Sequence, residues 1–133
     1  MAIRCEIDPI RRLVRLTHVS RASPAMWRDA VDRVLSQPAF QPGFDFIDDL
    51  TARVDVPSTL DIRSAVDFLA SRQASLAPCR WAMIVHPELP ATFGMIRMAE
   101  GLMEGSPITL RAFTSVGQAL VWLGPGSVAA SPA

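Results

Sequence analysis

The sequence predicts an α/β domain built on a single, mainly parallel β-sheet that opens with an antiparallel hairpin. Strand-like and helix-like segments alternate along the chain, and the first two strand-like segments are separated only by a short turn. Alternation of this kind implies βαβ units with right-handed crossovers and parallel strands. No change of composition divides the 133 residues, so we expect one domain over residues 1–124 with the order β-β-α-β-α-β-α-β-α.

The hairpin and the first helix are predicted from patterns near the N-terminus. Residues 3–8 alternate apolar with mainly charged side chains, which is typical of a half-buried strand. A turn signal follows, and residues 13–19 form a second strand that should pair antiparallel with the first. Ser23 precedes a proline, as an N-cap precedes the first helical position, and apolar residues at helical spacing then continue to about residue 36.

A third strand and a long helix are expected in the middle of the chain. Residues 44–50 form the strand, which ends in acidic residues. Ser58 and Asp61 have the spacing of a capping box with aspartate in place of glutamate, just before the helix. The apolar stripe of that helix runs from Ile62 to Leu76, so we expect one continuous helix over this range.

The last third of the chain completes the sheet. Residues 81–85 are apolar without alternation, as in a central strand that is covered on both faces. A helix over about residues 91–104, a strand over residues 108–113 and a helix capped by Ser115 should follow. The tail over residues 125–133 has little apolar bulk and is expected to be disordered.

The composition argues against several classes of function. Thirteen basic residues balance thirteen acidic ones, so no long-range field draws the chain to nucleic acid or to an anionic membrane. Every basic residue is arginine, which removes Walker-type phosphate binding, Schiff-base chemistry and the lysine of a two-component receiver site. Glycine-rich nucleotide loops, the Gly-x-Ser-x-Gly motif and the His-Glu-x-x-His motif are also absent. We therefore expect no enzymatic activity, no cofactor and no metal.

The spacing of the cysteines and the N-terminal sequence indicate in which cellular compartment the chain is expected. Cys5 and Cys79 form no Cys-x-x-Cys pair, and we expect both to be reduced, small core residues. The first eight residues lack the apolar core of a secretion signal, and no apolar run is long enough to span a bilayer. A cytoplasmic protein without a membrane span is therefore expected.

The end of the third predicted strand is rich in carboxylates, namely Asp45, Asp48, Asp49 and Asp55. Open α/β sheets bind ligands at the carboxyl ends of their strands, and three or more carboxylates could hold Mg²⁺. Strand parity, however, sends Asp45 and Asp48 to opposite faces. The favoured interpretation is a solvated acidic rim that is paired in part with Arg53 or Arg63.

The two histidines are not placed at the spacing of a metal motif. His86 follows the predicted central strand at its carboxyl end, where it could line a pocket. The favoured interpretation is that His86 only forms hydrogen bonds at the strand end. A metal site at His18 or His86 would need further ligands.

Four segments carry a resemblance to a known family: the hairpin, residues 42–51, residues 104–113 and residues 119–124. Over roughly residues 1–124, and in this order, they resemble STAS-like bacterial proteins. These are relatives of the SpoIIAA-like anti-sigma factor antagonists, whose fold also occurs in lipid-binding SEC14 domains. The resemblance implies a SpoIIAA-like fold and a regulatory domain that acts by protein–protein docking.

In the phospho-regulated members of that family, a serine lies at the start of the helix after the third strand. Ser58 or Thr59 is the nearest equivalent, although Pro57 stands in place of the family's first serine and no glycine follows. A phosphate at a helix N-terminus would face free N–H groups and the positive end of the helix dipole. The alternative, which is favoured, is that Ser58 only caps the helix.

The helix predicted over about residues 91–104 is apolar around more than half of its circumference. Its expected core stripe consists of Met95, Ile96, Ala99, Leu102 and Met103, with Phe93 and Met98 on the two flanks. Methionine-rich surfaces adapt to varied partners or apolar ligands, so Phe93, Met95, Met98 and Met103 are a candidate partner or ligand face. A buried helix with methionine as gap filler is the favoured alternative.

Three functional hypotheses follow. The first is a non-enzymatic regulatory domain that docks onto a protein partner or onto a second copy of itself as a homodimer. The second is a carrier of a small apolar molecule or lipid, which needs a cavity between the methionine-rich helix and the sheet. The third is a phospho-switched anti-sigma factor antagonist that acts through Ser58 or Thr59.

Overall fold

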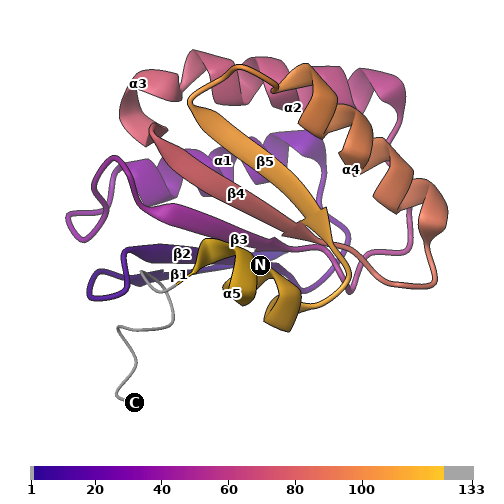
Figure 1. The fold of residues 1–133 in the computed structure, drawn as a ribbon, viewed down its shortest axis with the longest axis horizontal. Coiled ribbons are helices and arrows are strands. Elements are labelled where there is room, and N and C mark those ends of the chain that lie inside the picture. The colour runs from indigo at the N-terminus through magenta and orange to yellow at the C-terminus, as the bar shows by residue number, and fades with distance from the viewer. Residues whose placement is uncertain (1, 125–133) are drawn as a thin grey trace.

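The computed structural model describes residues 2–124, and the tail predicted over residues 125–133 lies outside the described residues. Five strands form one mixed sheet in the order β1-β2-β3-β4-β5 (Figure 1). They are β1 (Ile3–Asp8), β2 (Leu13–His18), β3 (Asp45–Asp49), β4 (Cys79–Ile84) and β5 (Ile108–Phe113). β1 pairs antiparallel with β2, and the other neighbouring pairs are parallel. The predicted α/β fold with an N-terminal antiparallel hairpin is confirmed.

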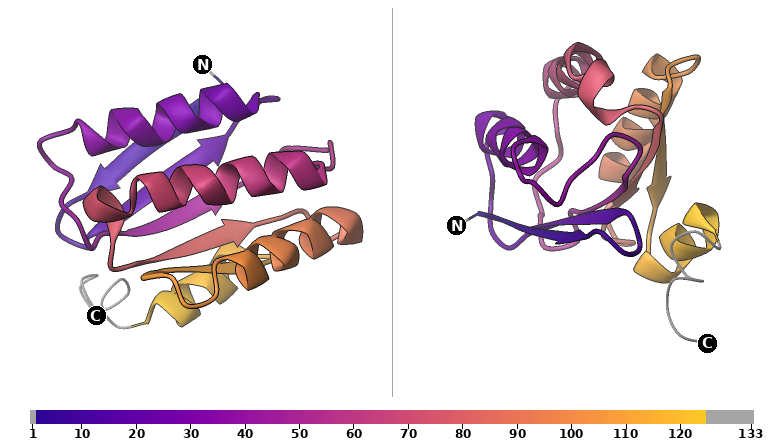
Figure 2. Two further views of the ribbon diagram at one scale, coloured as in Figure 1. Left: turned by 90° about the horizontal axis from the view of Figure 1, so that it is seen from above. Right: turned by 90° about the vertical axis from the view of Figure 1, so that its left-hand side faces the viewer.

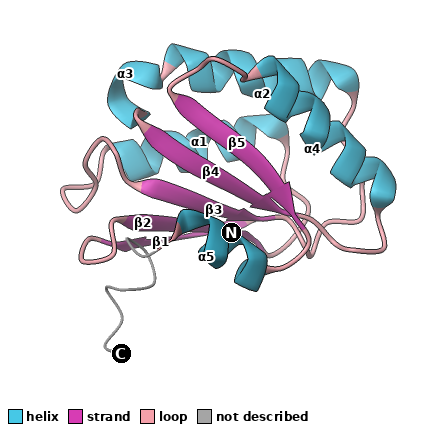
Figure 3. Cartoon of the chain, viewed as in Figure 1, coloured by secondary structure: helices cyan, strands magenta, loops and turns pink. Residues whose placement is uncertain are grey.

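The helices lie on both faces of this sheet. They are α1 (Pro24–Leu35), α2 (Thr59–Ser71), α3 (Gln73–Leu76), α4 (Pro90–Leu102) and α5 (Val116–Leu123). α1, α2 and α4 cover one face, whereas α5 lies on the other (Figure 2). Figure 3 shows how each of the three covering helices connects one parallel strand to the next. Crossovers of one hand between successive neighbouring strands place their helices on the same face.

The larger core lies between the sheet and the three covering helices. The ring of Phe46 stacks on Trp81 at its centre, with ring centroids 4.0 Å apart and planes 6° apart. Trp27 meets Trp81 edge to face, with ring centroids 6.1 Å apart. All three side chains are buried. A smaller core on the opposite face lies beneath α5 and includes Ile47 and Leu123.

The helix expected to run without a break to Leu76 is interrupted. α2 ends at Ser71, and Arg72 adopts φ −102° and ψ 6° before α3 begins. The Nε of Arg72 donates to Oδ1 of Asp32 in α1 at 2.8 Å, and its guanidinium lies 4.7 Å from the ring centroid of Phe68. The prediction of one continuous helix was wrong. At the break Arg72 contacts Asp32 of α1, and the apolar spacing within a helix does not reveal a contact with another helix.

The capping box predicted at the start of α2 is confirmed. The backbone N–H of Asp61 donates to Oγ of Ser58 at 3.0 Å, and the backbone N–H of Ser58 donates to Oδ2 of Asp61 at 3.1 Å. Two backbone donors that the helix itself cannot satisfy are therefore paired. This fixes where the segment after β3 turns into α2.

The cap gives a stability prediction. Ser58→Ala should lower the free energy of unfolding by about 1 kcal/mol, since the hydroxyl acceptor of the N-cap is lost. Thr59→Ala is the matched control, because Thr59 is exposed and its side chain forms no cap. Urea denaturation of both variants measures the difference. Equal effects of the two changes would contradict a capping role for Ser58.

Candidate functional site

A cavity of about 460 Å³ opens at the carboxyl ends of the parallel strands, on the face that α1, α2 and α4 cover. Its apolar walls are formed by Ala22, Met26, Trp27, Leu50, Ile62, Ala65, Met83 and Ile96. This is the edge at which open α/β sheets bind ligands. Sites for small molecules are mostly apolar, with a few polar groups that fix orientation.

A buried carboxylate lies behind the cavity wall. Asp48, near the end of β3, is 0% exposed. The indole N–H groups of Trp27 and Trp81 donate to its Oδ2 at 2.8 and 3.2 Å, and Nε2 of His18 lies 2.9 Å from Oδ1. One oxygen of Asp48 thus accepts two hydrogen bonds, and the other is paired with the imidazole of His18. Hydrogen bonding of this kind makes a buried charge tolerable.

The second ring nitrogen of His18, Nδ1, is a buried polar atom of a residue that lines the cavity. His18 is 1% exposed and lines the cavity, and its Nδ1 has no hydrogen-bond partner among the described residues. The same holds for Oγ1 of Thr92, a residue that is 5% exposed and lines the same cavity from α4. Buried polar atoms are almost always paired, because leaving one unpaired costs about 1–3 kcal/mol. Two such atoms at one apolar cavity favour a site for a polar group.

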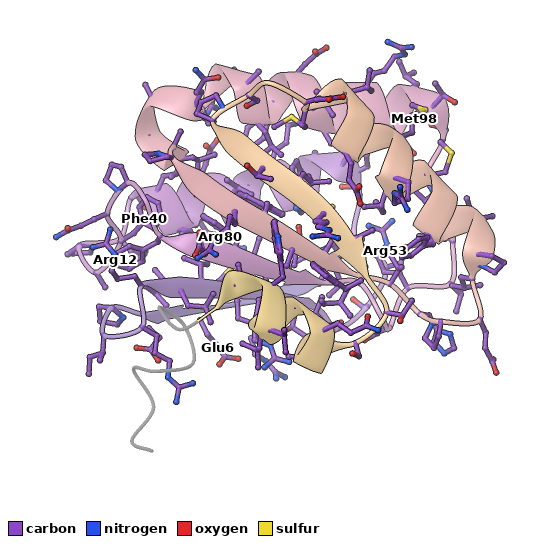
Figure 4. All side chains as sticks on the ribbon, viewed as in Figure 1. Glu6, Arg12, Phe40, Arg53, Arg80 and Met98 are labelled. Atoms are coloured by element: carbon purple, nitrogen blue, oxygen red, sulfur yellow. The ribbon has the colours of Figure 1, made fainter. Side chains whose placement is uncertain are left out.

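Charged side chains gather at the mouth of the cavity. Nη2 of Arg53 lies 2.6 Å from Oδ2 of Asp55, and this hydrogen bond is the main cause that lowers the pKa of Asp55. Figure 4 places Arg53 near the carboxyl ends of the strands. Arg21 and Arg28 also line the mouth, and neither forms a salt bridge with a residue that the structure describes.

The acidic residues of β3 do not form the solvated rim expected from the sequence. Asp48 and Asp49 are 0% and 8% exposed. Strand parity holds, since Asp45 lies on the opposite face from Asp48 and bonds to Arg80 at 2.7 Å. The rim interpretation was wrong for Asp48 and Asp49, and nitrogen donors from neighbouring elements compensate the burial of Asp48. The expected pairing with Arg53 is confirmed at Asp55. Within residues 2–124, no group of three or more side chains of His, Cys, Asp or Glu could hold a metal ion.

Ser58 and Thr59 are both exposed at the N-terminus of α2, next to the cavity. Their neighbours Pro57 and Asp61 line the cavity. Oγ of Ser58 is engaged in the capping box, with the carboxylate of Asp61 3.1 Å from the Ser58 backbone nitrogen. A phosphate on Ser58 would displace this cap and meet a carboxylate. A phospho-switch at either residue stays a prediction.

The candidate face on α4 is largely in contact with the core. Met103 is buried, and Phe93, Met95 and Met98 are half-buried against the larger core. Figure 4 places Met98 on α4, at the top of the molecule. α4 contributes Thr92 and Ile96 to the cavity, rather than any of these four residues.

One position of the predicted stripe of α4 was wrong. Leu102 is 41% exposed, and the buried positions are Thr92, Ile96 and Ala99, followed by Met103 just after the helix. Their spacings of three and four residues keep them on one side of the helix. This places the hydroxyl of Thr92 in the buried stripe, although its residue type did not suggest it.

The remaining residues considered from the sequence have simple roles. Nδ1 of His86 accepts a hydrogen bond from the backbone N–H of Glu88 at 3.0 Å, as expected at a strand end. Burial raises the pKa of Cys79 to about 12, with Asp45 adding to the shift, and burial also raises the pKa of Cys5. Because only the thiolate is a good nucleophile, neither cysteine is suited to covalent catalysis at neutral pH.

Comparison of the chain with protein-family models, with curated proteins and with solved structures gave no match. The resemblance to STAS-like proteins therefore stays a prediction. Among the described helices, none is long and apolar enough to cross a membrane. The geometry of the cavity is thus the main evidence on function.

The Asp48 network gives a second stability prediction. Asp48→Ala should lower the free energy of unfolding by roughly 3–5 kcal/mol, because three buried nitrogen atoms lose their acceptor. Asp32→Ala is the matched control and should have a far smaller effect, since its ion pair with Arg72 is exposed. Chemical denaturation measures both. A loss no larger for Asp48→Ala than for Asp32→Ala would refute the proposed importance of the network.

Proposed function

We propose that this chain binds a small, mainly apolar molecule in the cavity at the carboxyl ends of its strands. The observation that carries the proposal is that two buried polar atoms of residues lining one apolar cavity, Nδ1 of His18 and Oγ1 of Thr92, have no partner among the described residues. Such an arrangement suits a ligand that fills the apolar space and pairs with the two atoms. The resemblance expected from the sequence, to proteins whose fold also occurs in lipid-binding SEC14 domains, is in line with this proposal.

The affinity and the orientation of such a ligand would have different sources. A volume of about 460 Å³ is within the usual size of ligand sites, roughly 300–1,000 Å³. Contact with walls such as Ile62 and Met83 would remove apolar surface from water, which contributes about 25 cal/mol per Å². Hydrogen bonds to His18 and Thr92 would then fix the orientation of the ligand.

The role we propose is binding without chemical conversion, in line with the absence of catalytic motifs from the sequence. Ser23 lines the cavity, but its Oγ accepts a hydrogen bond from the backbone N–H of Met26 at 3.2 Å as the N-cap of α1. Its hydroxyl therefore has a structural task. The cavity fits the carrier hypothesis, with the N-terminal half of α4 as its boundary in place of the methionine-rich face.

Docking of a protein partner or of a second copy is the second candidate. It is favoured by exposed apolar side chains in and after the segment that follows β3: Val54 is 82%, Val56 49% and Leu60 76% exposed. Apolar side chains grouped on a surface are typical of interaction sites. Size-exclusion chromatography with light scattering tests self-association, and a dimer that Leu60→Ser converts to a monomer would support this candidate.

Binding can be tested with N-phenyl-naphthylamine, an uncharged probe whose fluorescence rises in apolar sites. Ala65→Phe should weaken its binding more than about tenfold, because the added ring occupies the cavity. Ala70→Phe, at an exposed position of α2 outside the cavity lining, should bind the probe as the unchanged protein does. Urea denaturation verifies that both variants fold. Absence of binding to the unchanged protein, or equal weakening by both variants, would argue against the proposal.

A further inference from the structure

The carboxylates of the cavity lining already have partners. Asp55 is bonded to Arg53, and Asp61 accepts from the backbone N–H of Ser58 in the capping box. Both carboxylates of the lining are therefore engaged. α4 and α1 supply hydrogen-bond donors to the same cavity.

The N-terminus of α4 supplies the first donors. The residue before the helix, Leu89, provides no side-chain cap, and the first i→i−4 bond of the helix runs from Phe93 to Leu89 at 3.2 Å. The backbone N–H groups of Ala91 and Thr92 therefore lie in the turn that has no i→i−4 partners, at the positive end of the helix dipole. Thr92 lines the cavity from this turn, and its Oγ1 has no hydrogen-bond partner among the described residues.

Arginines supply positive charge at the mouth. Three arginines (Arg21, Arg28 and Arg53) and two aspartates line the cavity, which leaves one excess positive charge. Within residues 2–124, the hydrogen bond of Arg28 is a long one, 3.5 Å from Nη1 to Oγ of Ser64. Positive charge in a cleft attracts anions.

His18 adds a second polar atom without a partner to this part of the cavity. Nε2 of His18 lies 2.9 Å from Oδ1 of Asp48, and Nδ1 has no hydrogen-bond partner among the described residues. His18 and Thr92 both line the cavity, so a polar head group is expected on this side of it.

From these contacts we infer that the ligand is an apolar carboxylic acid, held with its carboxylate at the N-terminus of α4 and its apolar body between α1 and α2. This inference rests on the proposed function and adds the chemical class of the ligand. The carboxylate accepts hydrogen bonds from the hydroxyl and the backbone N–H of Thr92, and Arg28 adds charge at the mouth. An alcohol of the same length lacks the charge, and an amine meets the arginines with like charge.

The test compares decanoate, decanol and decylamine, which differ only in the head group and its oxidation level. Isothermal titration calorimetry at low salt should give at least about tenfold tighter binding for decanoate than for decanol, and the weakest binding for decylamine. Arg28→Gln and Thr92→Val should reduce the advantage of decanoate over decanol. Arg97→Gln is the matched control, because Arg97 lies outside the cavity and bonds to Glu100 at 3.2 Å.

The outcomes separate the two proposals. If decanol binds as tightly as decanoate and Ala65→Phe abolishes both, the cavity binds apolar molecules and the inference about the acid is wrong. A preference for decylamine, or an advantage of decanoate that survives both Arg28→Gln and Thr92→Val, also overturns it. If none of the three compounds binds, the proposed function itself falls. Urea denaturation of Thr92→Val verifies folding, and Arg28→Gln provides the second variant.

Discussion

The arrangement of the domain depends on the hydrogen bonds that stabilise one buried carboxylate. Asp48 has no access to solvent, so its oxygens need donors from within the protein. These donors come from three other elements: His18 from β2, Trp27 from α1 and Trp81 from β4. A shift of β3 by one residue would turn Asp48 to the opposite face and leave all three nitrogen atoms without an acceptor. The network therefore helps to specify the register of the central strands and the position of α1.

The hydrogen bonds of Asp48 also orient two residues that line the cavity. Because Nε2 of His18 is held by Asp48, the imidazole ring has a fixed orientation, and its Nδ1 is left without a partner among the described residues. Trp27 has a double role, since its indole N–H donates to Asp48 and the residue also forms part of the cavity wall. Stability of the core and geometry of the candidate site thus depend on the same atoms.

Most of the fold follows from local patterns in the sequence. Alternation predicted the hairpin, serine caps predicted the starts of α1, α2 and α5, and the continuous apolar run predicted the central strand β4. The site was harder to predict, because it depends on which strands are neighbours. Alternation along β2 places His18 on the same face as Leu16, and alternation along β3 places Asp48 and Asp45 on opposite faces. His18 and Asp48 come together only because Leu16 of β2 pairs with Asp48 of β3, and this pairing cannot be read from either strand alone. Two indole N–H groups in need of buried acceptors were the signal available in the sequence.

The segment that joins β3 to α2 belongs both to the cavity and to the outer surface. Arg53, Asp55 and Pro57 contribute to the cavity lining, while Val54 and Val56 between them point to solvent. Alternate residues of one short stretch of backbone thus face two different environments. A ligand that displaced Arg53 would act on the same stretch of backbone that carries Val54 and Val56. Any effect of such a ligand on a neighbour bound at the valines would be matched by an equal effect of the neighbour on the ligand.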